Sequence, residues 1–120
     1  MNGNGRERGS VTAETATALP ALALLLAMAL WAVSAAGAQV RCTDAARLGA
    51  RAAARGEPLA WVRAVTGRAA PAGARVTVGR DASVTRVAVA APVPPPLAGG
   101  LRVLVVSANA VAETEPGAAR

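Results

Sequence analysis

Hydrophobic residues dominate the first third of the chain. Residues 15–40 carry no charge, and leucine and alanine fill most of the centre of this run. As a helix, a run of about 26 residues would be about 39 Å long, which exceeds the roughly 30 Å hydrocarbon core of a bilayer. The pattern therefore predicts a helix that spans a membrane over about residues 15–40.

The helical pattern continues past the uncharged run and becomes amphipathic. Arg41, Asp44, Arg51 and Arg55 recur at three-, four- and seven-residue steps on one side, which predicts one long helix over residues 10–55. Small side chains on the other side suit close helix packing, against neighbouring subunits or over a sheet, although they also reflect the high helix propensity of alanine. These small residues are Ala38, Cys42, Ala45, Ala46, Gly49, Ala52 and Ala53.

After Gly56, a favourable helix stop, residues 56–73 predict a short second helix and its connection. Pro58 is tolerated in the first turn of a helix, and Trp61 is expected to anchor a core. The apolar side of this helix is expected to consist of Leu59, Val62, Val65 and Ala69.

From residue 74 the period changes to alternation, and residues 74–112 predict a three-stranded antiparallel meander. The strands are expected at 75–78, 83–91 and 101–111, with a turn at 79–82. Val84 is out of phase with Val87 and Val89, which leaves a bulge or a slipped register open. The proline-rich segment 92–96 is not expected in a sheet interior, and residues 113–120 form a polar tail. The fold class is therefore α+β.

The composition argues against several classes of function. A chain of 120 residues supports one small domain, and its net charge of +6 comes from arginines that are scattered rather than clustered. With neither Phe nor Tyr to stack bases, a nucleic-acid partner is not expected. The chain has no His, its acidic residues show no catalytic spacing, and Cys42 is the only cysteine, so we expect no enzyme, no metal site, no cofactor and no internal disulfide. Cys42 remains able to pair with another chain.

Glu14 stands immediately before the uncharged run and is the main functional candidate. A carboxylate at the edge of a membrane helix is costly unless it is paired. An alternative is that Ser10 or Thr12 caps the helix and Glu14 complements its positive end. Pro20, inside the run, would free one backbone carbonyl and kink the helix, either as an ordinary membrane kink or to give flexibility during extraction from the membrane.

The stretch Gly9-Ser10-Val11-Thr12-Ala13-Glu14, between a short basic leader and the apolar run, resembles the processing site of type IV prepilins. The resemblance implies that a prepilin peptidase cuts between Gly9 and Ser10 and removes residues 1–9 as a leader. Glu14 would then be the fifth residue of the mature chain. In a filament its partner would be the new α-amino group of a neighbouring subunit, and this pair would set the axial register.

Beyond that motif, Glu14, Pro20, the Ala/Arg-rich helix after Arg41 and the Val-rich C-terminal strands are similar to TadE-like minor pilins of tight-adherence pili. This resemblance implies a single-pass inner-membrane protein with an extracytoplasmic C-terminal domain. Its partners would be prepilin peptidase, other pilin subunits, inner-membrane assembly proteins and the lipid bilayer. The chain departs from some TadE-like proteins in lacking a Cys pair outside the membrane.

Two alternatives stay open. Ala36-Gly37-Ala38 before Gln39 has the small-x-small pattern of a signal peptidase site, so cleavage there would release residues 39–120 as a soluble protein. The chain could also be an unprocessed single-span protein. In that case the arginines after the span outnumber Arg6 and Arg8, which favours a cytoplasmic C-terminal side.

Overall fold

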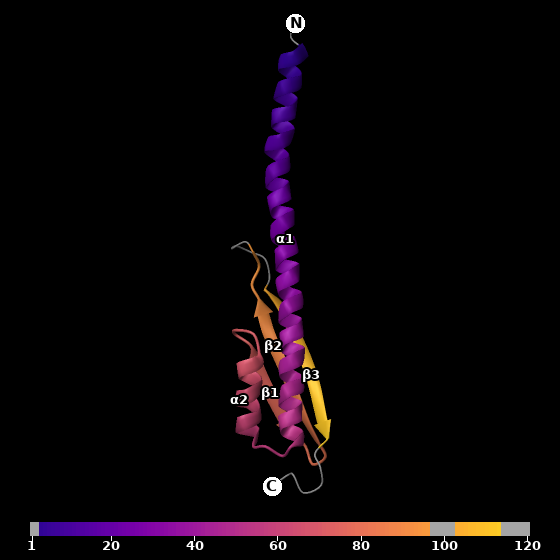
Figure 1. Ribbon diagram of the computed structural model, residues 1–120, viewed down its shortest axis with the longest axis vertical. Coiled ribbons are helices and arrows are strands. Elements are labelled where there is room, and N and C mark those ends of the chain that lie inside the picture. Colours follow the sequence, from indigo (N-terminus) through magenta and orange to yellow (C-terminus); the bar gives the residue numbers. More distant parts are fainter. Residues whose placement is uncertain (1–2, 97–102, 114–120) are drawn as a thin grey trace.

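The computed structural model describes residues 3–96 and 103–113 and confirms the α+β class (Figure 1). A three-stranded sheet and a short helix pack against the last part of one very long helix, and the molecule extends over 91 Å. The elements are α1 (Gly3–Ala54), α2 (Leu59–Ala69), β1 (Arg75–Arg80), β2 (Val84–Val93) and β3 (Leu104–Glu113).

Helix α1 has three parts that differ in what surrounds them. All side chains described in residues 3–26, which we call the arm, are exposed. In residues 27–38, the neck, Ala27, Trp31, Ala35 and Ala38 are half-buried at helical spacing. The remainder of α1 packs with α2 and the sheet to form the head, which comprises residues 39–96 and 103–113. Helix α1 also begins at Gly3, so it extends into the expected leader and does not start at residue 10.

Helix α1 ends where the sequence places its stop. Gly56 has a φ of 79°, a left-handed conformation that glycine adopts without a steric penalty. Its N–H donates to the Ala53 carbonyl at 3.0 Å, and the Glu57 N–H donates to the Ala52 carbonyl at 3.3 Å. These two bonds form a Schellman motif, which satisfies carbonyls that the end of the helix leaves open.

The stripe of small residues on α1 is covered by the chain's own head. Cys42, Ala45, Ala46 and Ala52 are fully buried, and the residues packed with them come from α2 and all three strands. The expectation that this stripe contacts neighbouring subunits is therefore wrong. The stripe instead covers the apolar face of a sheet that is too small to form a core alone.

Gly49 is the point of closest approach between α1 and α2. A Cβ at this position would overlap the Thr66 hydroxyl and would lie 3.1 Å from Cγ1 of Val87. Thr66 is itself fully buried, and its hydroxyl donates to the Val62 carbonyl at 2.7 Å. Glycine is therefore needed here for space.

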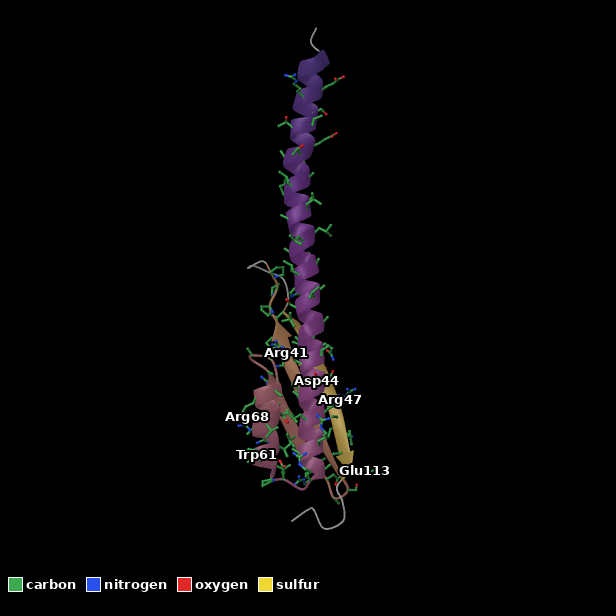
Figure 2. All side chains as sticks on the ribbon, in the orientation of Figure 1. Arg41, Asp44, Arg47, Trp61, Arg68 and Glu113 are labelled. Carbon is green, nitrogen blue, oxygen red and sulfur yellow. The ribbon has the colours of Figure 1, made fainter. Side chains whose placement is uncertain are left out.

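Helix α2 packs on the core through most of the expected face, because Val62 is buried and Leu59 and Val65 are half-buried. The expectation fails at Ala69, which is exposed, while Thr66 is buried. Trp61 is 49% exposed, with the Arg68 guanidinium 5.2 Å from its ring centroid (Figure 2). The expectation that Trp61 anchors the core is wrong, because the hydroxyl of Thr66 is satisfied within the helix and this smaller residue can take the buried position.

The sheet is an antiparallel meander with strand order β1-β2-β3. Val87 and Val89 face α1 and are fully buried, while Val84 lies out of phase with them. Both ladders nevertheless run without interruption, so the expected bulge or slipped register is absent between β1, β2 and β3. The expected turn also starts too early, because Gly79 and Arg80 still pair with Arg86 and Thr85.

Pro92 and Val93 belong to β2, which corrects the expectation that the proline segment stays outside the sheet. They pair with Val105 and Leu104 of β3. The pairing with β1 stops at Ala90, so β2 is an edge strand from there on, and proline is tolerated at such an edge. At the other end, Glu113 is the last residue of β3, so the strand includes one residue assigned to the polar tail; residues 114–120 lie outside the described residues.

Two polar side chains tie the layers of the head together. Arg80 on β1 donates from Nη2 to the Glu57 carbonyl at 3.1 Å and from Nε to Oγ1 of Thr85 at 3.2 Å. Gln39 on α1 donates from Nε2 to the Ser107 carbonyl of β3 at 2.8 Å. Because β3 is an edge strand, this bond satisfies a carbonyl at that edge.

Cys42 should report on opening of the head. Its thiol is fully buried, and this desolvation raises the pKa of the Cys42 thiol above its ordinary value. Because the thiolate is the reactive form, we expect a maleimide to label the native chain slowly at neutral pH and the urea-unfolded chain rapidly. A native chain that labels as fast as the unfolded chain would contradict this packing. A disulfide to another chain would likewise require the thiol to leave the core.

Candidate processing and assembly site

Gly9 and Ser10 lie inside α1, at the free end of the arm (Figure 1). A Cβ added at Gly9 would meet no atom within 4 Å. Glycine in a helix costs about 1 kcal/mol relative to alanine, and at Gly49 the fold provides a packing reason for that cost. At Gly9 the fold provides none, and the same holds at Gly37 and Gly67, so packing neither requires nor excludes glycine at the expected cleavage site.

Glu14 lies one turn after Ser10 on the same side of the arm, along a shallow surface that also includes Ala13, Thr17 and Ala18. Its side chain is exposed and has no hydrogen-bond or ion-pair partner among the side chains described in residues 7–96 and 103–113. The ion pair found in that part of the chain joins Arg55 to Glu57, at 3.0 Å. Glu14 is separated from Cys42, in the core of the head, by 28 residues of helix, or about 42 Å.

Helix capping does not explain Ser10, Thr12 or Glu14. Because α1 begins at Gly3, all three residues lie at least one turn inside the helix rather than at its start. The Thr12 hydroxyl donates backward to the Arg8 carbonyl at 2.9 Å instead of forward to a free N–H. The alternative interpretation of these residues as a cap is therefore wrong.

The threonines at the start of the apolar run are internally satisfied. Thr15 donates to the Val11 carbonyl at 2.9 Å, and Thr17 donates to the Ala13 carbonyl at 2.7 Å. Such bonds remove the cost of transferring a free hydroxyl into an apolar phase. Glu14 is the one charged residue in residues 14–40.

Pro20 does not interrupt α1, which remains helical from Gly3 to Ala54. Proline has no N–H, so the carbonyl one turn earlier, at Ala16, has no donor from position 20. Flexibility at this point during extraction from a membrane stays a prediction.

A helix of this length and composition can cross a bilayer. Within residues 7–54, its most apolar 18-residue window has a mean hydropathy of 2.1 and is not buried by the rest of the chain. The fold therefore defines an α+β protein whose N-terminal helix is long and apolar enough to span a membrane.

The sequence is 40% identical over 107 residues to Apoptosis inhibitor Rv3655c of Mycobacterium tuberculosis (strain ATCC 25618 / H37Rv). The alignment covers 87% of this chain and 78% of that protein, and the chain belongs to the family of that protein. No protein-family model matches the chain. No solved structure matches it either.

Proposed function

We propose that this chain is a minor pilin or pilin-like subunit of a tight-adherence type IV pilus, or of the system that assembles it. The observation that carries the proposal is Glu14, an unpartnered carboxylate on an exposed arm that the head does not contact. The arm and the neck together supply a long apolar helix for the bilayer, and the head supplies a folded domain at the other end of α1. The proposal gives the chain no catalytic role.

In this proposal prepilin peptidase cleaves between Gly9 and Ser10. The chain then remains in the inner membrane through α1, with the head outside the cytoplasm. When subunits assemble, their arms leave the lipid and pack side by side, and Glu14 pairs with the α-amino group of a neighbouring Ser10. A buried carboxylate that has only one possible partner favours one axial register over all others.

The position of the mature N-terminus tests this proposal. We expect intact mass and N-terminal sequencing of the membrane-extracted protein to give a start at Ser10. This start should disappear when the prepilin peptidase is deleted, and the full-length chain should accumulate instead. A chain that keeps its leader in the wild-type cell would argue for an unprocessed single-span protein and against the proposal.

The name of the relative points to a second candidate function, inhibition of apoptosis. A soluble inhibitor would have to leave the membrane, and cleavage after Ala38 would release it. Every fully buried side chain in the described residues follows this position, and Gln39 itself bonds to Ser107, so the packed core would stay with the released part. A mature start at Gln39 in the same experiment would favour this second function.

A further inference from the structure

We propose that the head does not stand clear of the membrane, and that its end nearest the arm inserts into the interfacial region of the bilayer. This end, which we call the proximal end, consists of Pro92, Val93, Pro94, Val103, Leu104 and Val105. The inference rests on the membrane anchoring of α1, which is part of the proposed function, but it is independent of processing and of pilus assembly.

A hydrogen bond fixes the level of β3 along α1. Gln39 donates to the Ser107 carbonyl, so these two residues lie at the same height. β3 runs in the same direction as α1, and its first residues lie beside the middle of that helix (Figure 1). Leu104 precedes Ser107 by three residues, or about 10 Å of strand. The same distance is about seven residues of helix, so Leu104 lies level with about residue 32, inside the uncharged run.

The arm alone is too short to cross a bilayer. From Glu14 to Ala27, where α1 first becomes half-buried, there are about 13 residues or about 20 Å. The hydrocarbon core is about 30 Å thick and needs about 20 residues. A hydrocarbon core that begins beside Glu14 therefore reaches about Ser34, within about one helical turn of the level of Leu104.

The surface of the proximal end suits this position. Val103, Leu104 and Val105 are 51%, 42% and 60% exposed, and Pro92 and Pro94 are exposed beside them. No charged residue occurs in residues 87–96 or 103–112, and Arg102 lies outside the described residues. Exposed apolar side chains of the neck lie between this level and the exposed leucines of the arm, which argues for lipid as the partner of the proximal end.

Arginines mark where the apolar surface ends. Arg75 pairs with Ala90, which pairs with Ser107, so Arg75 lies in the row that Gln39 marks. Arg41 follows Gln39 by two residues and lies at the same end of the head (Figure 2). Both side chains are exposed. Guanidinium groups on long apolar stems reach the phosphates of a membrane surface, so this row fits the headgroup level.

The free edge of β3 limits the depth of insertion. Unpaired backbone groups of an edge strand are costly in the hydrocarbon core but are satisfied by water and headgroups at the interface. The proximal end is therefore placed in the interfacial region, and the charged residues at the far end of the head, Arg80, Asp81 and Glu113, remain in water.

The depth of single spin labels tests this placement. Val105 and Val111 form a matched pair, because both lie on the same face of β3 and are 60% and 57% exposed, about 20 Å apart along the strand. The full chain with Cys42→Ala would carry Leu22→Cys, Val105→Cys or Val111→Cys, each labelled with a nitroxide. Accessibility to oxygen and to a water-soluble nickel complex would be measured in phosphatidylcholine–phosphatidylglycerol vesicles at low protein-to-lipid ratio.

We expect labels at Leu22 and Val105 to lose access to nickel and gain access to oxygen, with the opposite result at Val111. A Val105 label that behaves like the Val111 label, while Leu22 lies in lipid, would overturn the inference and leave the anchoring intact. A Leu22 label in water would reject the anchoring itself. Nickel protection of Val105 that increases with the protein-to-lipid ratio would show that a second copy covers the surface, and would also overturn the inference.

Discussion

Replacing Gly49 with leucine is expected to remove most of the free energy that holds α1 on α2 and the sheet. The first added carbon would already overlap the Thr66 hydroxyl and lie 3.1 Å from Cγ1 of Val87. Overpacking of this kind costs about 1 to 3 kcal/mol for small additions and more for large ones. We expect about 3 kcal/mol or more for Gly49→Leu and about 1 to 3 kcal/mol for Gly49→Ala. In a head this small, the larger loss approaches the total stability.

The readout is the urea concentration at which Cys42 becomes reactive to a maleimide, measured on the full chain in detergent micelles. Gly37→Ala is the matched control, because it is the same change in the same helix, at a position where a Cβ would meet no atom within 4 Å. Removing the obstructing hydroxyl with Thr66→Ala should reduce the cost of Gly49→Ala, and this coupling would assign the effect to that contact. Equal urea midpoints for Gly37→Ala and Gly49→Ala would contradict the close packing.

Elements defined by local signals could be predicted from the sequence. The uncharged run, the arginines at helical spacing and Gly56 determine α1 and its end, because helix periodicity and capping depend on nearby residues. Alternation around Val87 and Val89 likewise determined β2 and its buried face. The start of α1 has no such local signal, because the leader is rich in glycine, which has low helix propensity, and the resemblance to prepilins predicts a start at residue 10.

The sequence predictions that the structure contradicts concern features that depend on tertiary contacts. Trp61 is the larger and more apolar side chain, yet Thr66 is the buried one, because α2 packs against Gly49 with the face that carries Thr66. Pro92 can join β2 because the pairing with β1 stops two residues earlier, at Ala90. The proline segment itself carries no signal for the extent of a neighbouring strand. The candidate site is a different case from these fold elements. The sequence identifies its residues, but the partner expected for Glu14 belongs to another molecule.

Replacing Glu14 with alanine is expected to leave cleavage intact and to block incorporation into pili. In the proposed assembly, each subunit buries Glu14 against an α-amino group of its neighbour. Breaking one member of a buried ion pair costs about 3 to 5 kcal/mol, because the other charge is left unpaired. Every 1.4 kcal/mol is a tenfold change in an equilibrium constant, so the loss is more than a hundredfold at each contact. Glu14→Gln keeps the shape and removes the charge, and it should have a similar effect.

The measurement compares the amount of the chain in sheared pili with the amount in membranes. Glu7→Gln is the control, because it removes a carboxylate from the same helix at a position that cleavage after Gly9 would discard. The Glu14 variants should also keep the wild-type protection of Cys42, since the two residues are about 42 Å apart along α1. Loss from pili with a mature start at Ser10 and a protected Cys42 would assign Glu14 to assembly alone. Normal amounts of Glu14→Ala in pili would show that the carboxylate has no role in register, and the exposed arm would then need another explanation.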